Sequence, residues 1–255
     1  MGKGLENVRR IYIEGIAQGN IREAVLQCTG HRYTQHSTGV GDGAEGFLKF
    51  FEPFLARNPK REMEIVRIFE DGPWVFCSAY QSLNDGAAQW VTMDMFYTDP
   101  NGLILEHWDT IAPFVEQTQS GAHMVGGATE ASPQVDTAIS KSLVLEFTKQ
   151  ILQERNFDKL DRFMGDDLVQ RAATIGAGVA GMKSWLLSEQ AGDYEMLFNL
   201  IGQGDLVSTY GKRYAGGKSI AVFDVYRVAN NKIVEHWMNE EEIGPRENWG
   251  NSGKF

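Results

Sequence analysis

A histidine and an aspartate near residue 107 are the side chains best placed to exchange a proton with a bound molecule. The stretch "ILEHWDTIAP" separates His107 and Asp109 by two positions. Side chains alternate between the faces of a β-strand, so these two are expected on one face. A carboxylate can remove a proton next to a carbonyl group where dry, aromatic surroundings move its pKa toward neutrality. The same pair could also form an ordinary ion pair or hydrogen bond at a strand end.

Two further residues join this set, each with a question attached. Asp94 lies one predicted strand earlier, and a slip of one residue in the hairpin register would send it to the opposite face. His36 follows Tyr33 and Gln35 in a polar segment before a glycine-rich loop. Core packing explains a Gln-His pair there poorly, so we predict a functional role for His36.

The Glu-His-Trp motif occurs twice, which indicates an internal repeat. The segment "VTMDMFYTDPNGLILEHWD" aligns with "IAVFDVYRVANNKIVEHWM" when one loop residue is removed, and a weaker match extends upstream. The alignment pairs Asp94 with Asp224, Phe96 with Tyr226, His107 with His236, Asp109 with Met238, and His36 with Arg171. Because methionine cannot transfer a proton, the second copy is predicted to keep the scaffold and to have lost the site.

Helix and strand patterns recur in both copies. Apolar residues at helical spacing predict an amphipathic helix near residues 8–16 and again near 143–152. A second short helix, a polar strand or loop and a third helix follow, and the remainder alternates with turn residues such as Asp85-Gly86. The predicted fold class is α+β, with two cone-shaped domains, each having three N-terminal helices that cover a curved, mainly antiparallel sheet.

The composition of the chain suggests where the domains end. We predict a first domain over 1–118, a linker over 119–136, a second, degenerate domain over 137–245 and a C-terminal tail over 246–255. The linker prediction depends on a stretch rich in Gly, Ser, Ala and Thr.

Each predicted copy resembles the SnoaL-like polyketide cyclase branch of the nuclear-transport-factor-2-like superfamily. The stretch "YTQHSTGVGDGAEGFLKFF" is similar to the Gln-His loop and third helix of that branch, and "GLILEHWDTIAP" is similar to its closing strand. The resemblance covers about residues 5–114 in the first copy. In the second copy it depends mainly on "FDVYRVANNKIVEHW".

The resemblance implies roles for the candidate residues. Asp109 would act as the general acid/base, Asp94 would assist it, and His36 would line the pocket. His107 would polarise the developing enolate oxygen. The substrate pocket is expected to include Tyr33, Gln35, Phe50 and Phe96.

The predicted function is acid–base chemistry without a cofactor, of the cyclase, isomerase or dehydratase (lyase) type. The substrate would be an apolar, carbonyl-bearing small molecule in the first domain. The alternative is a tandem-domain protein that binds small molecules without turnover, because a fold does not dictate a function. The resemblance implies no metal, although His36, Asp94, His107 and Asp109 could in principle hold one.

Charge and composition narrow the partners. A formal net charge of -10 argues against nucleic acid and anionic membranes as partners. No run approaches the ~20 apolar residues of a membrane span. The start "MGKGLENVRR" lacks the apolar stretch of a secretory signal. With Cys28 and Cys77 interpreted as buried thiols, the predicted location is the cytoplasm.

Aromatic residues that alternate along the predicted strands suggest an assembly. One alternate set must face away from the helices, and we place Trp108 in that set. Domains of the family that the chain resembles commonly pair through this outer face. We therefore expect an intramolecular pseudo-dimer, and the same face also allows a homo-oligomer.

Overall fold

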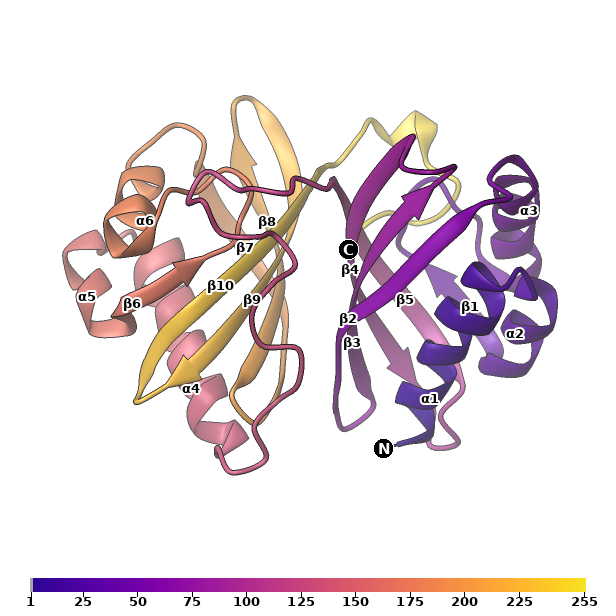
Figure 1. Ribbon diagram of the computed structural model, residues 1–255, viewed down its shortest axis with the longest axis horizontal. Coiled ribbons are helices and arrows are strands. Elements are labelled where there is room, and N and C mark those ends of the chain that lie inside the picture. The colour runs from indigo at the N-terminus through magenta and orange to yellow at the C-terminus, as the bar shows by residue number, and fades with distance from the viewer. Residues whose placement is uncertain (1) are drawn as a thin grey trace. The chain divides into compact units, whose positions relative to one another are not determined.

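Two five-stranded sheets, each with its own helices, make up the computed structural model, which describes residues 2–255 (Figure 1). The chain forms two compact units. Unit 1 contains the described residues up to Pro113 together with Gly244–Phe255, and unit 2 contains Phe114–Ile243. The predicted α+β class is confirmed in both units.

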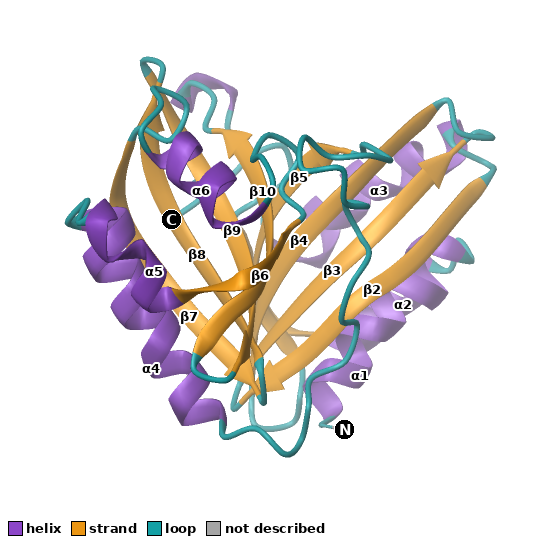
Figure 2. Ribbon diagram, turned by 60° about the vertical axis from the view of Figure 1, so that its left-hand side comes forward, coloured by secondary structure: helices purple, strands orange, loops and turns teal. Residues whose placement is uncertain are grey.

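In unit 1 the helices lie against one face of the sheet (Figure 2). The helices are α1 (Lys3–Arg10), which continues as the π-helix η1 (Ile11–Ala17), α2 (Ile21–Cys28) and α3 (Gly43–Arg57). The strands are β1 (Thr29–Gln35), β2 (Arg61–Asp71), β3 (Trp74–Leu83), β4 (Ala88–Thr98) and β5 (Ile104–Pro113). Their order in the sheet is β1-β5-β4-β3-β2, with β1 parallel to β5 and the other pairs antiparallel.

Unit 2 repeats this arrangement. Its helices are α4 (Thr137–Phe147), continued by the π-helix η2 (Thr148–Gln153), then the 3-10 turn η3 (Phe157–Lys159), α5 (Leu160–Phe163) and α6 (Gly178–Leu186). Its strands are β6 (Met164–Gln170), β7 (Asp193–Gln203), β8 (Leu206–Ala215), β9 (Lys218–Ala229) and β10 (Lys232–Glu242). The order β6-β10-β9-β8-β7 matches unit 1 position by position.

The turns that set the hairpin registers use the residues expected of them. Gly102 has φ +84° in the loop between β4 and β5, and Asn230 and Asn231 have φ +52° and +56° in the matching loop of unit 2. Only glycine, asparagine and aspartate adopt this left-handed region readily. With these turns, Asp94 pairs with Asp109 across β4 and β5, and Asp224 pairs with Met238 across β9 and β10.

The residue ranges of the two units differ from the predicted domain boundaries. Residues 119–136, predicted as a linker, belong to unit 2, where Gln119 N donates to Ala173 O at 3.1 Å. Residues 246–255, predicted as a separate tail, belong to unit 1, where Gly250 N donates to Thr38 O at 2.8 Å. The tail contains the 3-10 turn η4 (Arg246–Asn248). Backbone hydrogen bonds to a neighbouring loop, rather than composition, decide where each segment lies.

None of the helices within residues 2–255 is long and apolar enough to cross a membrane.

Candidate active site

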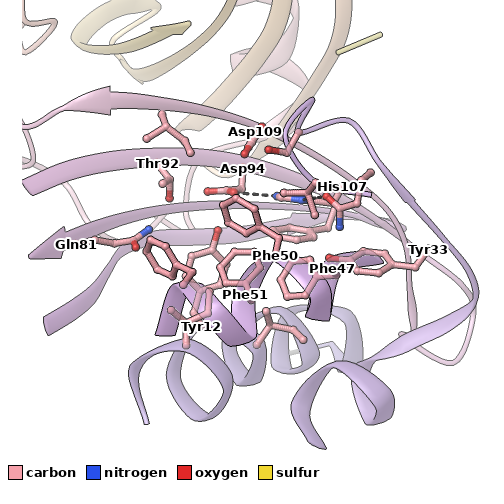
Figure 3. Close-up of a pocket in the computed structure, with 18 of the residues that line it drawn as sticks. Tyr12, Tyr33, Phe47, Phe50, Phe51, Gln81, Thr92, Asp94, His107 and Asp109 are labelled. Carbon is pink, nitrogen blue, oxygen red and sulfur yellow. Dashed lines mark hydrogen bonds and ion pairs between the residues drawn. The ribbon is translucent and has the colours of Figure 1, made fainter. Parts of the chain in front are cut away.

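An apolar cavity of about 310 Å³ lies in unit 1 between the helices and the inner face of the sheet (Figure 3). Its apolar lining includes Val40, Phe47, Phe50, Phe51, Phe54 and Phe96. This volume is at the lower end of the range for small-molecule sites, roughly 300 to 1,000 Å³. The cavity therefore suits a compact apolar ligand.

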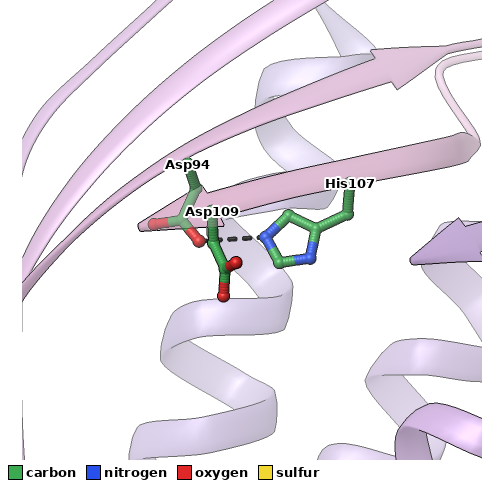
Figure 4. A group of neighbouring side chains, drawn as sticks. All are labelled: Asp94, His107 and Asp109. Carbon is green, nitrogen blue, oxygen red and sulfur yellow. Dashed lines mark hydrogen bonds and ion pairs between the residues drawn. The ribbon is translucent and has the colours of Figure 1, made fainter. Parts of the chain in front are cut away.

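Asp94, His107 and Asp109 meet at the cavity wall (Figure 4). Asp94 comes from β4, and the other two come from β5, where they share a face because they are two residues apart. Each of the three side chains offers one nitrogen or oxygen atom that could bind a metal ion, and these atoms all lie within 4.8 Å of one another. All three residues are buried. The register question for Asp94 is thereby settled, since its side chain faces the cavity.

Hydrogen bonds fix the ring of His107. Its Nδ1 lies 2.9 Å from Gln35 Oε1, and its Nε2 lies 2.9 Å from Asp94 Oδ1. The ring also stacks on Phe96, with the centroids 4.6 Å apart. Because a carbonyl oxygen only accepts, Nδ1 carries a hydrogen, and the proton near Nε2 is shared with Asp94. Both ring nitrogens thus have protein partners, and the role of His107 at an enolate oxygen stays a prediction.

Burial raises the pKa of Asp94, and the neighbouring charge of Asp109 adds to the rise. Hydrogen bonds from His107 and Tyr12 and the charge of His107 act in the opposite direction without cancelling it. A low-dielectric site disfavours the carboxylate form, which makes Asp94 a stronger base than an exposed aspartate.

Asp109 differs from Asp94 although both are buried. Burial alone would raise the pKa of Asp109, but the charges of Lys254 and His107 and hydrogen bonds from Lys254 and Ser37 outweigh it, so its pKa is lowered. Lys254 Nζ donates to Asp109 Oδ1 at 2.8 Å and to Asp109 O at 2.9 Å. Asp109 is therefore held as a carboxylate beside an ammonium group.

The opposite pKa shifts predict opposite pH dependences of stability. Asp94 contributes stability below its ordinary pKa, and this contribution is lost as the pH rises through its raised pKa. The free energy of unfolding of Asp94→Asn should therefore rise relative to that of the wild type as the pH rises through this window. The contribution of Asp109 is present above its ordinary pKa and is lost as the pH falls through the lowered one, so Asp109→Asn should fall furthest behind at neutral pH. Urea unfolding of both variants from about pH 2 to pH 8 measures this, because the window for Asp109 lies below the ordinary aspartate pKa of about 3.9 and the window for Asp94 lies above it. A stability difference from the wild type that does not change with pH in either variant would contradict the prediction.

Four residues that the sequence predicts in the substrate pocket lie in the cavity lining. These are Tyr33, Gln35, Phe50 and Phe96. Gln35 also takes a role that the sequence did not suggest, since it orients His107 from the strand next to β5.

His36 lies on the other face of the sheet, which corrects its predicted place in the pocket. Its ring stacks on Trp108 with the centroids 4.5 Å apart, and Nε2 lies 3.4 Å from Glu106 Oε2. Both partners alternate with His107 and Asp109 along β5, so they face away from the cavity. Since Gln35 points into the cavity, the next residue must point out.

The residue that sequence reasoning missed is Lys254. Its side chain is 1% exposed and its ammonium group contacts Asp109. The two positions are 145 residues apart, and a lysine in the polar stretch "NSGKF" gives no sign of burial.

Unit 2 keeps the histidine network but not the second carboxylate. His236 Nε2 lies 2.8 Å from Asp224 Oδ1, and Gln170 Nε2 donates to His236 Nδ1 at 2.9 Å. Ala172 N donates to Gln170 Oε1 at 2.9 Å, which fixes the amide orientation. Met238, at the position of Asp109, belongs to the hydrophobic core of unit 2.

The three side chains of unit 1 have a spacing that could also suit a metal ion. Their contacts do not favour a metal site, because His107 Nε2 is directed at Asp94 Oδ1 and the ammonium group of Lys254 already neutralises Asp109. The absence of a metal from the working protein stays a prediction.

The chain is similar to one protein family and to several solved structures. Residues 8–107 match the SnoaL-like domain family, and no curated protein matches the chain. Among solved structures, a proposed polyketide cyclase from Bacillus cereus is 18% identical, covers 43% of this chain and 74% of its own, and has a TM-score of 0.38. A proposed ketosteroid isomerase from Kribbella flavida is 14% identical, with 44% and 84% coverage and a TM-score of 0.39. An LEH-like epoxide hydrolase from M. tuberculosis is 22% identical, with 41% and 84% coverage and a TM-score of 0.35.

Unit 1 consists of helices that cover a curved sheet around an apolar cavity, and three buried titratable side chains lie at the cavity wall. The family match over residues 8–107 lies within unit 1, and this unit is similar to a SnoaL-like domain.

Proposed function

We propose that unit 1 is a cofactor-independent enzyme that moves a proton next to a carbonyl group of an apolar small molecule, as in a cyclase, isomerase or dehydratase. The observation that supports this most is the buried group of Asp94, His107 and Asp109 at the wall of an apolar cavity. Burial of titratable groups with opposite pKa shifts in one cavity is typical of acid–base sites.

We assign the base to Asp94 rather than to Asp109. A base works best when its pKa lies near the working pH, and the pKa of Asp94 is raised whereas that of Asp109 is lowered. In this mechanism the Asp94 carboxylate accepts the proton from the carbon next to the carbonyl group and returns it later to the same or a neighbouring carbon. His107 holds the Asp94 carboxyl in place.

The hydroxyl of Tyr33 is our candidate donor to the developing enolate oxygen. Tyr33 lines the cavity beside Gln35, and burial raises its pKa, which keeps the phenol protonated. A fixed donor aimed at developing negative charge stabilises the transition state without reorganisation.

The lining also limits the charge of the substrate. Outside the acid–base group, the polar residues of the described lining are Tyr12, Tyr33, Gln35, Ser37, Gln81 and Thr92, all with uncharged side chains. An ionic substrate would lose its hydration there with little compensation, so we expect a neutral one.

One observation favours the second candidate function, binding without turnover. Asp109, the acid/base group that the resemblance implies, is neutralised by Lys254. If Asp94 does not replace it as the base, the cavity holds a ligand and performs no chemistry.

Proton exchange distinguishes the two functions without knowledge of the natural substrate. The probe is 2-tetralone, a compact bicyclic ketone, incubated with the protein in D₂O, with deuterium at the carbons next to the carbonyl followed by NMR. An enzyme should accelerate the exchange above the buffer rate. Broadened 2-tetralone signals with exchange at the buffer rate would support the binding function instead.

Two predictions for the whole chain stay open to experiment. These are the cytoplasmic location and the pairing of the two units as a pseudo-dimer. A fragment that ends at residue 118 would lack Lys254, so its behaviour would report on the lost tail as well as on lost pairing. Sedimentation of the full chain tests the predicted homo-oligomer without this complication.

A further inference from the structure

The C-terminal tail, Gly244–Phe255, brings a lysine to the acid–base group of unit 1. In Figure 1 the tail is the yellow segment that follows β10 and belongs to unit 1. Lys254 is 1% exposed, and its Nζ lies 2.8 Å from Asp109 Oδ1. An ammonium group that leaves water needs a counter-charge, and Asp109 supplies it.

The tail is anchored through contacts that do not involve the lysine head group. Asn251 Nδ2 donates to Ser37 O at 2.6 Å and to Val40 O at 2.8 Å. His36 Nδ1 donates to Gly253 O at 2.7 Å. These bonds hold the tail against the loop that follows β1. None of them involves the side chain at position 254, so a neutral side chain there leaves these hydrogen bonds intact. They also give His36 a role outside the cavity, as an anchor for the tail.

Two buried aspartates that face each other across β4 and β5 cannot both ionise freely, because like charges in a low dielectric repel. A cation beside one of them decides which aspartate carries the charge. Lys254 contacts Asp109, while Asp94 has His107 and Tyr12 as hydrogen-bonding partners. The asymmetry of the two carboxyls therefore has a geometric origin in the tail.

We propose that Lys254 is a positioning residue that keeps Asp109 ionised and so leaves proton transfer to Asp94. The second half of the proposal rests on the proposed function, whereas the first half is a property of the folded protein.

The test is a carboxyl titration followed by NMR in protein labelled with ¹³C at the aspartate side chains. Asp109→Asn and Asp94→Asn assign the two signals, and the variants Lys254→Met and Lys254→Arg are compared with the wild type. The groups that face Asp109 are Lys254 from the tail, His107 and Asp94 from the sheet, and Tyr33 from β1.

In the wild type, Asp109 should titrate below an ordinary aspartate. Lys254→Met should raise its midpoint by at least one pH unit, because burial is then uncompensated, and Lys254→Arg should keep it low. A wild-type midpoint at or above the ordinary value would overturn the proposal even if no variant folds. An unchanged midpoint in a folded Lys254→Met protein would overturn it as well.

The titration needs no substrate, so it stands apart from the test of the proposed function. If 2-tetralone exchanges only at the buffer rate while Asp109 shifts as expected, Lys254 controls the charge of a binding site. If exchange is accelerated and Asp109 does not shift, the enzyme assignment survives and the role of Lys254 is wrong.

Discussion

Asp94→Asn should slow the exchange of 2-tetralone protons by about 100-fold to 10,000-fold, the usual contribution of a positioned general base. The amide has nearly the shape of the carboxyl but cannot accept the proton. Its hydrogen bond to His107 can persist, so the cavity should keep its form and its affinity for the probe. The rate of deuterium uptake at saturating 2-tetralone measures the effect.

Unit 2 offers a matched control for this variant. Asp224 makes the same contact with His236, at 2.8 Å, that Asp94 makes with His107 at 2.9 Å, and it is equally buried. Asp224→Asn should leave the exchange rate unchanged. A comparable loss in both variants would mean that Asp94→Asn acts through folding and not through proton transfer.

Separating Lys254 from Asp109 should destabilise the protein strongly. Lys254→Met leaves a buried carboxylate without its cation, which typically costs about 3 to 5 kcal/mol. The double variant Asp109→Leu with Lys254→Met removes both charges, and exchanging a buried pair for apolar residues is often close to neutral. The double variant should therefore be more stable than either single variant at pH 7.

A double-mutant cycle in urea measures this coupling. The control pair is Lys218 with Glu242, whose side chains are 59% and 53% exposed and whose charged atoms lie 2.6 Å apart. An exposed pair contributes about 0 to 1 kcal/mol, so Lys218→Met should have little effect. Additive losses for Asp109 and Lys254 would contradict the ion pair.

The sequence predicts much of the fold because its signals are local. The turn residues at Gly102 and at Asn230-Asn231 fix the hairpin registers, and the registers place Asp94 opposite Asp109 and Asp224 opposite Met238. Two-residue spacing along β5 then brings His107 to the same face. The period of two was sufficient to place His107 beside Asp109, whereas the sequence left the register of Asp94 open because a slip of one residue would have turned it to the other face.

The error at His36 was avoidable from the same period. Tyr33 and Gln35 share a face of β1, so the next residue belongs to the opposite face, where Trp108 and Glu106 lie. The resemblance to a Gln-His loop favoured a pocket position and outweighed that alternation. The alternation along a strand is the stronger constraint, because successive side chains of a pleated strand point to opposite faces of the sheet.

Lys254 shows what local signals cannot supply. Its position depends on where an irregular segment returns after β10, and that return is fixed by hydrogen bonds from Gly250 and Asn251 to a loop more than two hundred residues earlier. The composition of this tail is polar, which is typical of a solvent-exposed chain end. The pairing of a buried lysine with Asp109 is the observation behind our proposal that Asp94, rather than Asp109, is the base.

The most direct test of the account is the pH dependence of the exchange rate in the wild type. The titratable groups that face Asp94 are His107 and Asp109 from β5, Tyr12 from η1, Tyr33 from β1 and Cys77 from β3. If Asp94 is the base, exchange of 2-tetralone at low probe concentration should fall on the acid side with a midpoint above the ordinary aspartate value of about 3.9. The same midpoint should appear in the NMR titration of Asp94. An acid limb at or below the ordinary value, or one that persists unchanged in Asp94→Asn, would contradict the account.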